Sequence, residues 1–131
     1  MGRVIVTGYG IKLKFIDMAD GREAKKDVEG ITLPVEREWA KCVYWMYCIL
    51  IEDKFGMSRD DLMKKLEEKG IDTRLFFYPV HVMPPHKNNR KFPVAEEIAR
   101  KGINLPSGVS LKEGEVVKSI CDAIREIDKR R

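Results

Sequence analysis

The sequence predicts an α/β fold of the α+β two-layer sandwich type, in which a small sheet is packed by three helices. The run 43–51 is apolar, β-branched and aromatic and contains no Gly or Pro, which is typical of a central strand. Apolar residues recur at helical spacing in 58–69, 92–101 and 112–127. At 131 residues, with 44% hydrophobic residues, the chain is long enough to fold around one core.

The expected elements follow the order strand, helix, strand, helix, short strand, helix. Ser58 is a favourable N-cap for the first helix, and Gly70 is expected to end it in a left-handed conformation. The segment 71–78 is then expected to form a second core strand. Gly102 ends the next helix, and residues 103–105 are predicted to form a short strand.

The first residues are predicted to form two short strands, 3–7 and 11–16, around a turn at Gly8-Tyr9-Gly10. That turn is not interpreted as a phosphate loop, because no Gly-Lys-Ser and no GxGxxG pattern follows it. The sequence contains no internal repeat, and nothing in it predicts a second globular domain.

Composition narrows the function classes. The formal charge of +4 comes from 25 basic and 21 acidic residues that are mostly interleaved, with an excess of Lys and Glu often met in heat-adapted proteins. The basic runs 87–91 and 128–131 are interpreted as solvated surface, because no nucleic-acid motif surrounds them.

Three cysteines without CxxC spacing argue against a disulfide framework or a zinc site. No apolar run is long enough for a membrane span, so we expect a cytoplasmic protein.

The visible chemistry centres on the loop after the aromatic run 76–78. The sequence has no nucleophile elbow, no Walker loop and no metal-spaced cluster, so no catalytic residue and no metal ligand is assigned. His81 lies between Pro79 and Pro84, and these prolines are expected to stiffen the loop and hold the imidazole in place. The residues alone favour a structural role for His81, with donation to a hydroxyl or phosphate as the alternative.

Several motifs in register resemble the C-terminal small domain of the DegT/DnrJ/EryC1/StrS family of nucleotide-sugar aminotransferases. They are, in chain order, Glu29-Gly30-Ile31-Thr32-Leu33-Pro34, Tyr44-Trp45-Met46-Tyr47, Ser58-Arg59-Asp60-Asp61-Leu62, Gly70-Ile71-Asp72-Thr73-Arg74, Phe77-Tyr78-Pro79-Val80-His81, Pro84-Pro85, Phe92-Pro93-Val94-Ala95-Glu96 and Gly102-Ile103-Asn104-Leu105-Pro106-Ser107-Gly108. The resemblance runs from about residue 28 to residue 127, roughly three quarters of the chain.

The resemblance implies the small domain of a fold-type I transferase that depends on pyridoxal phosphate (PLP). In that family a larger N-terminal domain binds PLP through a lysine, and the small domain borders the sugar-nucleotide pocket. By carry-over, Arg74, Tyr78 and His81 are the residues expected to face a substrate. Arg74 suits a phosphate, while Tyr78 and His81 suit sugar hydroxyls.

The departures from the family define the functional hypotheses. Residues 1–27 do not match it, and residues 28–131 are expected to be the small domain. The PLP-binding domain and its lysine have no counterpart here, so no cofactor is expected in this chain alone. The leading reading is a truncated or free-standing aminotransferase domain without activity by itself. The alternative is an interaction module that dimerises or complements a separate PLP domain. Nucleic-acid binding is the weakest reading.

Overall fold

The computed structural model of this protein describes residues 5–7, 10–12, 28–34, 37–40, 45–106 and 113–130, with side chains described from residue 28 onward except at 113–117. The strands are β1 (Ile5–Thr7), β2 (Gly10–Lys12), β3 (Ile31–Thr32), β4 (Tyr47–Ile51), β5 (Arg74–Leu75) and β6 (Gly102–Leu105). The α-helices are α1 (Arg59–Glu68), α2 (Pro93–Lys101) and α3 (Glu113–Lys129), and the 3-10 helices are η1 (Asp53–Phe55), η2 (Val80–Val82) and η3 (Pro84–His86). Within these residues the fold is the predicted mixed α/β arrangement.

The main sheet has four antiparallel strands in the order β3-β4-β6-β5. Its register places Ile49 of β4 opposite Ile103 of β6. The central position predicted for the apolar strand is confirmed, although the strand begins at Tyr47. Tyr47, Ile49 and Ile51 are buried on one face, whereas the alternating residues are half-buried. An apolar run of this kind is typical of a strand covered on two faces, but the structure buries β4 fully on one face only.

The short strand after α2 lies in the middle of the sheet. All four residues of β6 are buried between β4 and β5. A Cβ on Gly102 would lie 2.6 Å from the Cβ of Phe76, so this crossing requires glycine. The strand predicted only as a short one is thus the strand that joins β4 to β5 in the sheet.

The segment 71–78, expected as a second core strand, is not one. Only Arg74–Leu75 pairs with β6, at the edge of the sheet, and both residues are exposed. An edge strand has a neighbour on one side only. The amide of Phe76 still donates to the carbonyl of Gly102 at 3.4 Å, beyond the last paired residue, Leu75. The aromatic residues after Phe76 leave the sheet.

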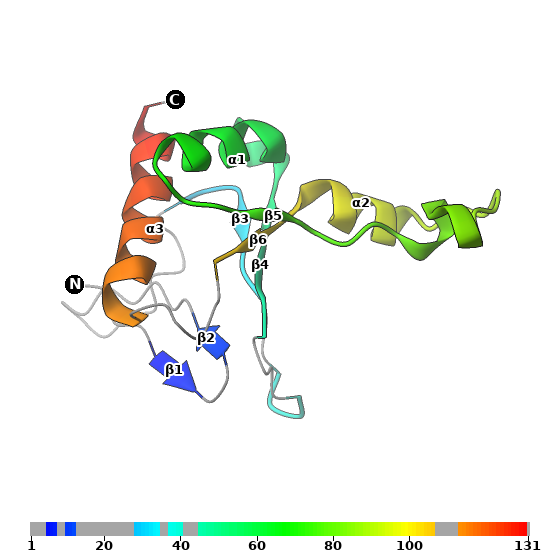
Figure 1. The fold of residues 1–131 in the computed structure, drawn as a ribbon, viewed down its shortest axis with the longest axis horizontal. Coiled ribbons are helices and arrows are strands. Elements are labelled where there is room, and N and C mark those ends of the chain that lie inside the picture. Colours follow the sequence, from blue (N-terminus) through cyan, green and yellow to red (C-terminus); the bar gives the residue numbers. More distant parts are fainter. Residues whose placement is uncertain are drawn as a thin grey trace.

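Two helices cover the buried face of the sheet. Ser58 caps α1 as predicted, because its hydroxyl accepts a hydrogen bond from the Asp61 amide at 3.1 Å. Gly70 follows with φ of 75°, the left-handed conformation expected of it. Figure 1 shows α1 at one end of the sheet and α3 alongside the sheet. The core that they form with β4 and β6 includes Leu62, Leu66, Ile103, Ile120, Ile124 and Ile127.

The third helix extends away from this core. Residues 76–101, which comprise η2, η3 and α2, project from the sheet as an arm (Figure 1). The apolar stripe predicted for α2 is present, yet the helix has no buried side chain. Val94 is 69% exposed, and Ile98 and Ala99 are half-buried. The arm therefore carries apolar side chains that this part of the molecule leaves uncovered.

The two strands predicted near the N-terminus form an antiparallel pair, with Ile5 opposite Lys12 and Thr7 opposite Gly10. Residues 8–9 of the expected turn and the ends of both predicted strands lie outside the described residues. Among the described helices, none is long and apolar enough to cross a membrane.

Candidate functional site

Prolines and short hydrogen bonds shape the loop that begins the arm. Pro79 precedes η2, and η3 begins with Pro84-Pro85. The amide of Met83 donates to the carbonyl of Val80 at 3.1 Å, and the amide of Asn88 donates to the carbonyl of His81 at 3.2 Å. The first bond closes a 3-10 turn that contains His81, and the second closes the loop formed by residues 81–88. Restricted motion of this loop stays a prediction from its prolines.

His81 joins this loop to α2. Its side chain is 9% exposed, and its Nε2 lies 2.9 Å from Oε1 of Glu96. The same oxygen accepts the amide hydrogen of Phe92 at 3.0 Å. The ring of Phe92 lies 4.8 Å from the imidazole between ring centroids, tilted by 52°. The Phe92 amide, and then His81, hold the pKa of Glu96 below its ordinary value.

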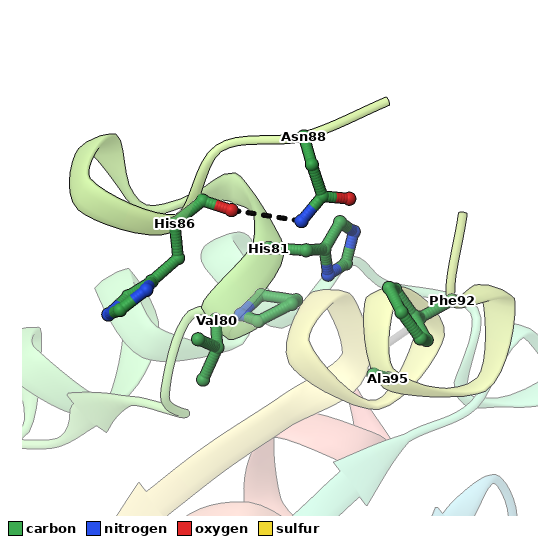
Figure 2. Close-up of a pocket in the computed structure, with 7 residues that line it drawn as sticks. Val80, His81, His86, Asn88, Phe92 and Ala95 are labelled. Atoms are coloured by element: carbon green, nitrogen blue, oxygen red, sulfur yellow. Dashed lines mark hydrogen bonds between the residues drawn. The ribbon is translucent and has the colours of Figure 1, made fainter. Parts of the chain in front are cut away.

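An open hollow of about 530 Å³ lies beside His81. Its lining consists of Pro79, Val80, His81, His86, Asn88, Phe92 and Ala95. Figure 2 shows the His81 ring between Asn88 and Phe92, with the side chain of His86 pointing away from it. The Asn88 amide is engaged internally, since its Nδ2 donates to the carbonyl of His86 at 2.9 Å. The hollow thus combines apolar walls with one imidazole, an arrangement suited to a ligand that has both C–H surfaces and hydroxyl groups.

The other two predicted substrate residues lie elsewhere. Arg74 is on the edge strand, where its Nη2 donates to Oδ2 of Asp72 at 3.0 Å, and both side chains are largely exposed. Tyr78 is 67% exposed, and neither residue lines the hollow. Close to them in sequence, Phe77 stacks on Trp45 with ring centroids 6.1 Å apart. Of the three predicted substrate residues, only His81 lines the hollow, whereas Arg74 and Tyr78 are exposed outside it.

Glu96 is the site residue that sequence reasoning missed. It stands four positions after Phe92, at the start of α2, where its carboxylate reaches back to the Phe92 amide. This spacing at a helix N-terminus was the available signal, since a side chain there often accepts a free amide hydrogen. Nothing in the sequence pairs Glu96 with a histidine 15 residues earlier.

Most lysines whose side chains are described are exposed, and Lys101 is paired with carboxylates. A Schiff-base lysine must lose its proton, which requires a desolvated setting or a cationic neighbour. Among lysines whose side chains are described, all except Lys65 and Lys101 are exposed. Lys101 donates to Glu52 at 2.7 Å and to Glu97 at 2.6 Å, and these carboxylates, Glu52 first, raise its pKa above the ordinary value. Its environment thus stabilises the proton that a Schiff base would have to remove.

The cysteines of the described part offer no nucleophile. Burial raises the pKa of the Cys48 thiol, and it raises the pKa of Cys121 to about 11. Cys121 is buried on α3, and Cys48 is half-buried on β4. Across the described residues no group of three or more His, Cys, Asp and Glu side chains is placed to hold a metal ion.

Comparison with known proteins identifies the family. Residues 22–125 match the DegT/DnrJ/EryC1/StrS aminotransferase family. The chain is 33% identical over 106 residues to the GDP-perosamine synthase of Vibrio cholerae, which covers 77% of the chain and 29% of that protein. It is 43% identical over 84 residues to the GDP-perosamine synthase of Escherichia coli O157:H7, which covers 63% of the chain and 22% of that protein.

A solved structure supports the same relationship. The fold is similar to S. venezuelae DesV, crystallised in complex with a ketimine intermediate, with a TM-score of 0.67 and 31% identity. That similarity covers 79% of this chain and 28% of DesV. The chain thus spans less than a third of the length of each of these three proteins. Enzymes of this family use PLP. The matched segment, the antiparallel sheet and the order of the helices agree, and this chain belongs to the DegT/DnrJ/EryC1/StrS aminotransferase family.

Proposed function

We propose that this chain serves as the small domain of a nucleotide-sugar aminotransferase of the GDP-perosamine synthase type, and that it does not transaminate by itself. The observation that carries the proposal is the match of residues 22–125 to the family, together with identity of 33% over 106 residues to one GDP-perosamine synthase. In this role the chain supplies substrate contacts, and the cofactor chemistry resides in a separate PLP-binding domain.

The geometry supports a binding role. The hollow beside His81 has apolar walls and an imidazole, while Arg74 and Tyr78 present an exposed cation and an exposed phenol. We assign His81 and Tyr78 to sugar hydroxyls and Arg74 to a phosphate, whose oxygens match the planar guanidinium. None of these groups is an activated nucleophile, and Lys101 holds its proton between two carboxylates.

A domain exchange tests this assignment. In the GDP-perosamine synthase of E. coli O157:H7, the segment that corresponds to residues 28–127 is replaced by residues 28–127 of this chain. Amino transfer to a keto-sugar nucleotide by the chimera is then measured. We expect the chimera to retain measurable activity, because equivalent domains border the same pocket. The matched control is the same enzyme with its segment deleted, which we expect to be inactive. A folded, PLP-loaded chimera without any activity would contradict the proposal.

An alternative function is that of an interaction module, and the exposed apolar surface of the arm favours it. Phe77, Val80, Val82, Met83 and Val94 are exposed along residues 76–101. Apolar surface of this extent usually marks an interface. A second copy of the chain would cover it in a twofold dimer, the commonest arrangement for such surfaces.

We therefore expect a homodimer, measurable by light scattering at micromolar concentration. Val80→Asp with Val94→Asp should shift the protein toward the monomer, because a carboxylate buried without a partner is costly. The matched control is a pair of aspartates at positions remote from the arm, Lys54→Asp and Lys64→Asp, which are exposed in the structure. A monomer in the unsubstituted protein would refute the dimer.

A further inference from the structure

The hydrogen bonds around Glu96 determine which nitrogen of His81 carries the proton. Oε1 of Glu96 accepts the amide hydrogen of Phe92 at 3.0 Å, so this oxygen acts as an acceptor. His81 Nε2 lies 2.9 Å from the same atom. An ionised carboxylate oxygen can only accept hydrogen bonds, so Nε2 must be the donor in this contact. The carboxylate is ionised at neutral pH, since the Phe92 amide and His81 lower its pKa.

The other ring nitrogen is left available. Among the described residues Nδ1 of His81 has no hydrogen-bond partner, and it is not one of the buried unpaired polar atoms there. It is therefore accessible although the side chain as a whole is 9% exposed. The Phe92 ring lies 4.8 Å from the imidazole between ring centroids, and the Nε2 contact with Glu96 fixes the orientation in which Nδ1 is left accessible.

We propose that Glu96 is a positioning residue that keeps the proton of His81 on Nε2 and presents Nδ1 to the hollow as an acceptor for a sugar hydroxyl. This inference rests on the proposed function and names the chemistry of its site. A neutral imidazole in this tautomer accepts from a hydroxyl and offers no donor to a phosphate. The negative charge of Glu96 also disfavours an anion at this position.

The walls of the hollow agree with a sugar ring. Pro79, Val80 and Ala95 contribute aliphatic surface, and Phe92 contributes an aromatic ring. A pyranose has apolar C–H faces and peripheral hydroxyls, so it matches aliphatic and aromatic walls next to a single acceptor. In the sequence, the basic run 87–91 lies between two residues that line the hollow, His86 and Phe92. Its positive charges could attract a phosphate, so phosphate is the competing ligand that the experiment must exclude.

Nitrogen-15 spectra of the histidine rings, recorded on the full 131-residue chain near pH 8, read the tautomer directly. His86→Gln assigns the two imidazoles. We expect a neutral His81 ring with the proton on Nε2. Glu96→Ala should give a mixture of tautomers, whereas Glu96→Gln should restore the single form, because its amide oxygen still accepts from Phe92 and from Nε2. Glu97→Ala, which removes the neighbouring carboxylate that binds Lys101, should leave the ring unchanged.

Ligand binding is measured on the same samples with GDP-mannose as a representative GDP-hexose and with GDP as the sugar-free probe. GDP-mannose should shift the Nδ1 resonance and GDP should not, and Glu96→Ala should weaken GDP-mannose binding by about tenfold. A proton on Nδ1 in the unsubstituted chain overturns the inference. An equal shift with GDP would overturn the hydroxyl assignment in favour of a phosphate. The expected tautomer together with no binding of either probe contradicts the proposed function while supporting the role of Glu96.

Discussion

Replacing Ile49 by alanine is expected to lower the free energy of unfolding by about 2–5 kcal/mol. Ile49 is 2% exposed and lies on β4, opposite Ile103 of β6. The substitution removes buried methyl groups and leaves a cavity between the sheet and the helices that cover it, and both effects destabilise the folded state. Urea denaturation followed by circular dichroism gives the midpoint and the slope from which the change is calculated.

Lys64→Ala is the matched control for this measurement. Lys64 is exposed on α1, outside both the core and the apolar surface of the arm, so the free energy of unfolding should change by less than about 0.5 kcal/mol. A similarly small change for Ile49→Ala would place that residue at the surface and invalidate the central position of β4.

Purified chain mixed with PLP is expected to form no stoichiometric covalent adduct at a single lysine and to transfer no amino group. Apart from Lys65, which is half-buried, the lysines whose side chains are described are exposed or, in the case of Lys101, paired with carboxylates that stabilise the protonated form. A protonated amine cannot attack the cofactor aldehyde. Absorbance spectra, mass spectrometry after borohydride reduction and an amino-transfer assay with a keto-sugar nucleotide measure each part of this prediction.

The GDP-perosamine synthase of V. cholerae, assayed under the same conditions, provides the positive control. Slow reaction of exposed lysines with excess PLP would distribute label over many sites and would not accompany turnover. A single lysine modified in stoichiometric amount, together with amino transfer, would show that the chain is an active enzyme by itself.

Local signals determined the limits of the helices. Ser58, Gly70 and Gly102 act on backbone conformation within a few residues of themselves, so their roles at helix ends follow from the sequence. The structure agrees with each of them. The apolar run of β4 was equally informative, because no surface strand would carry so many large apolar side chains.

Local signals also misled where the environment is set by distant residues. The run 71–78 has the composition of a buried strand, yet only Arg74–Leu75 pairs, at an edge. The stripe on α2 has the spacing of a packed helix, yet no residue of the described part buries it. In both cases the sequence indicates apolar surface, and whether that surface is covered depends on what lies opposite.

The sequence by itself determined the fold class, the three helices, the central strand and the family to which the chain belongs. Tertiary structure alone decided that β6 joins the two halves of the sheet, that 76–101 project as an arm, and that His81 meets Glu96. The physical reason is the distance along the chain over which each interaction acts. Caps, turns and periodicity act over a few residues, whereas strand order and the partner of a buried imidazole depend on contacts between segments far apart in the chain, which no local pattern encodes.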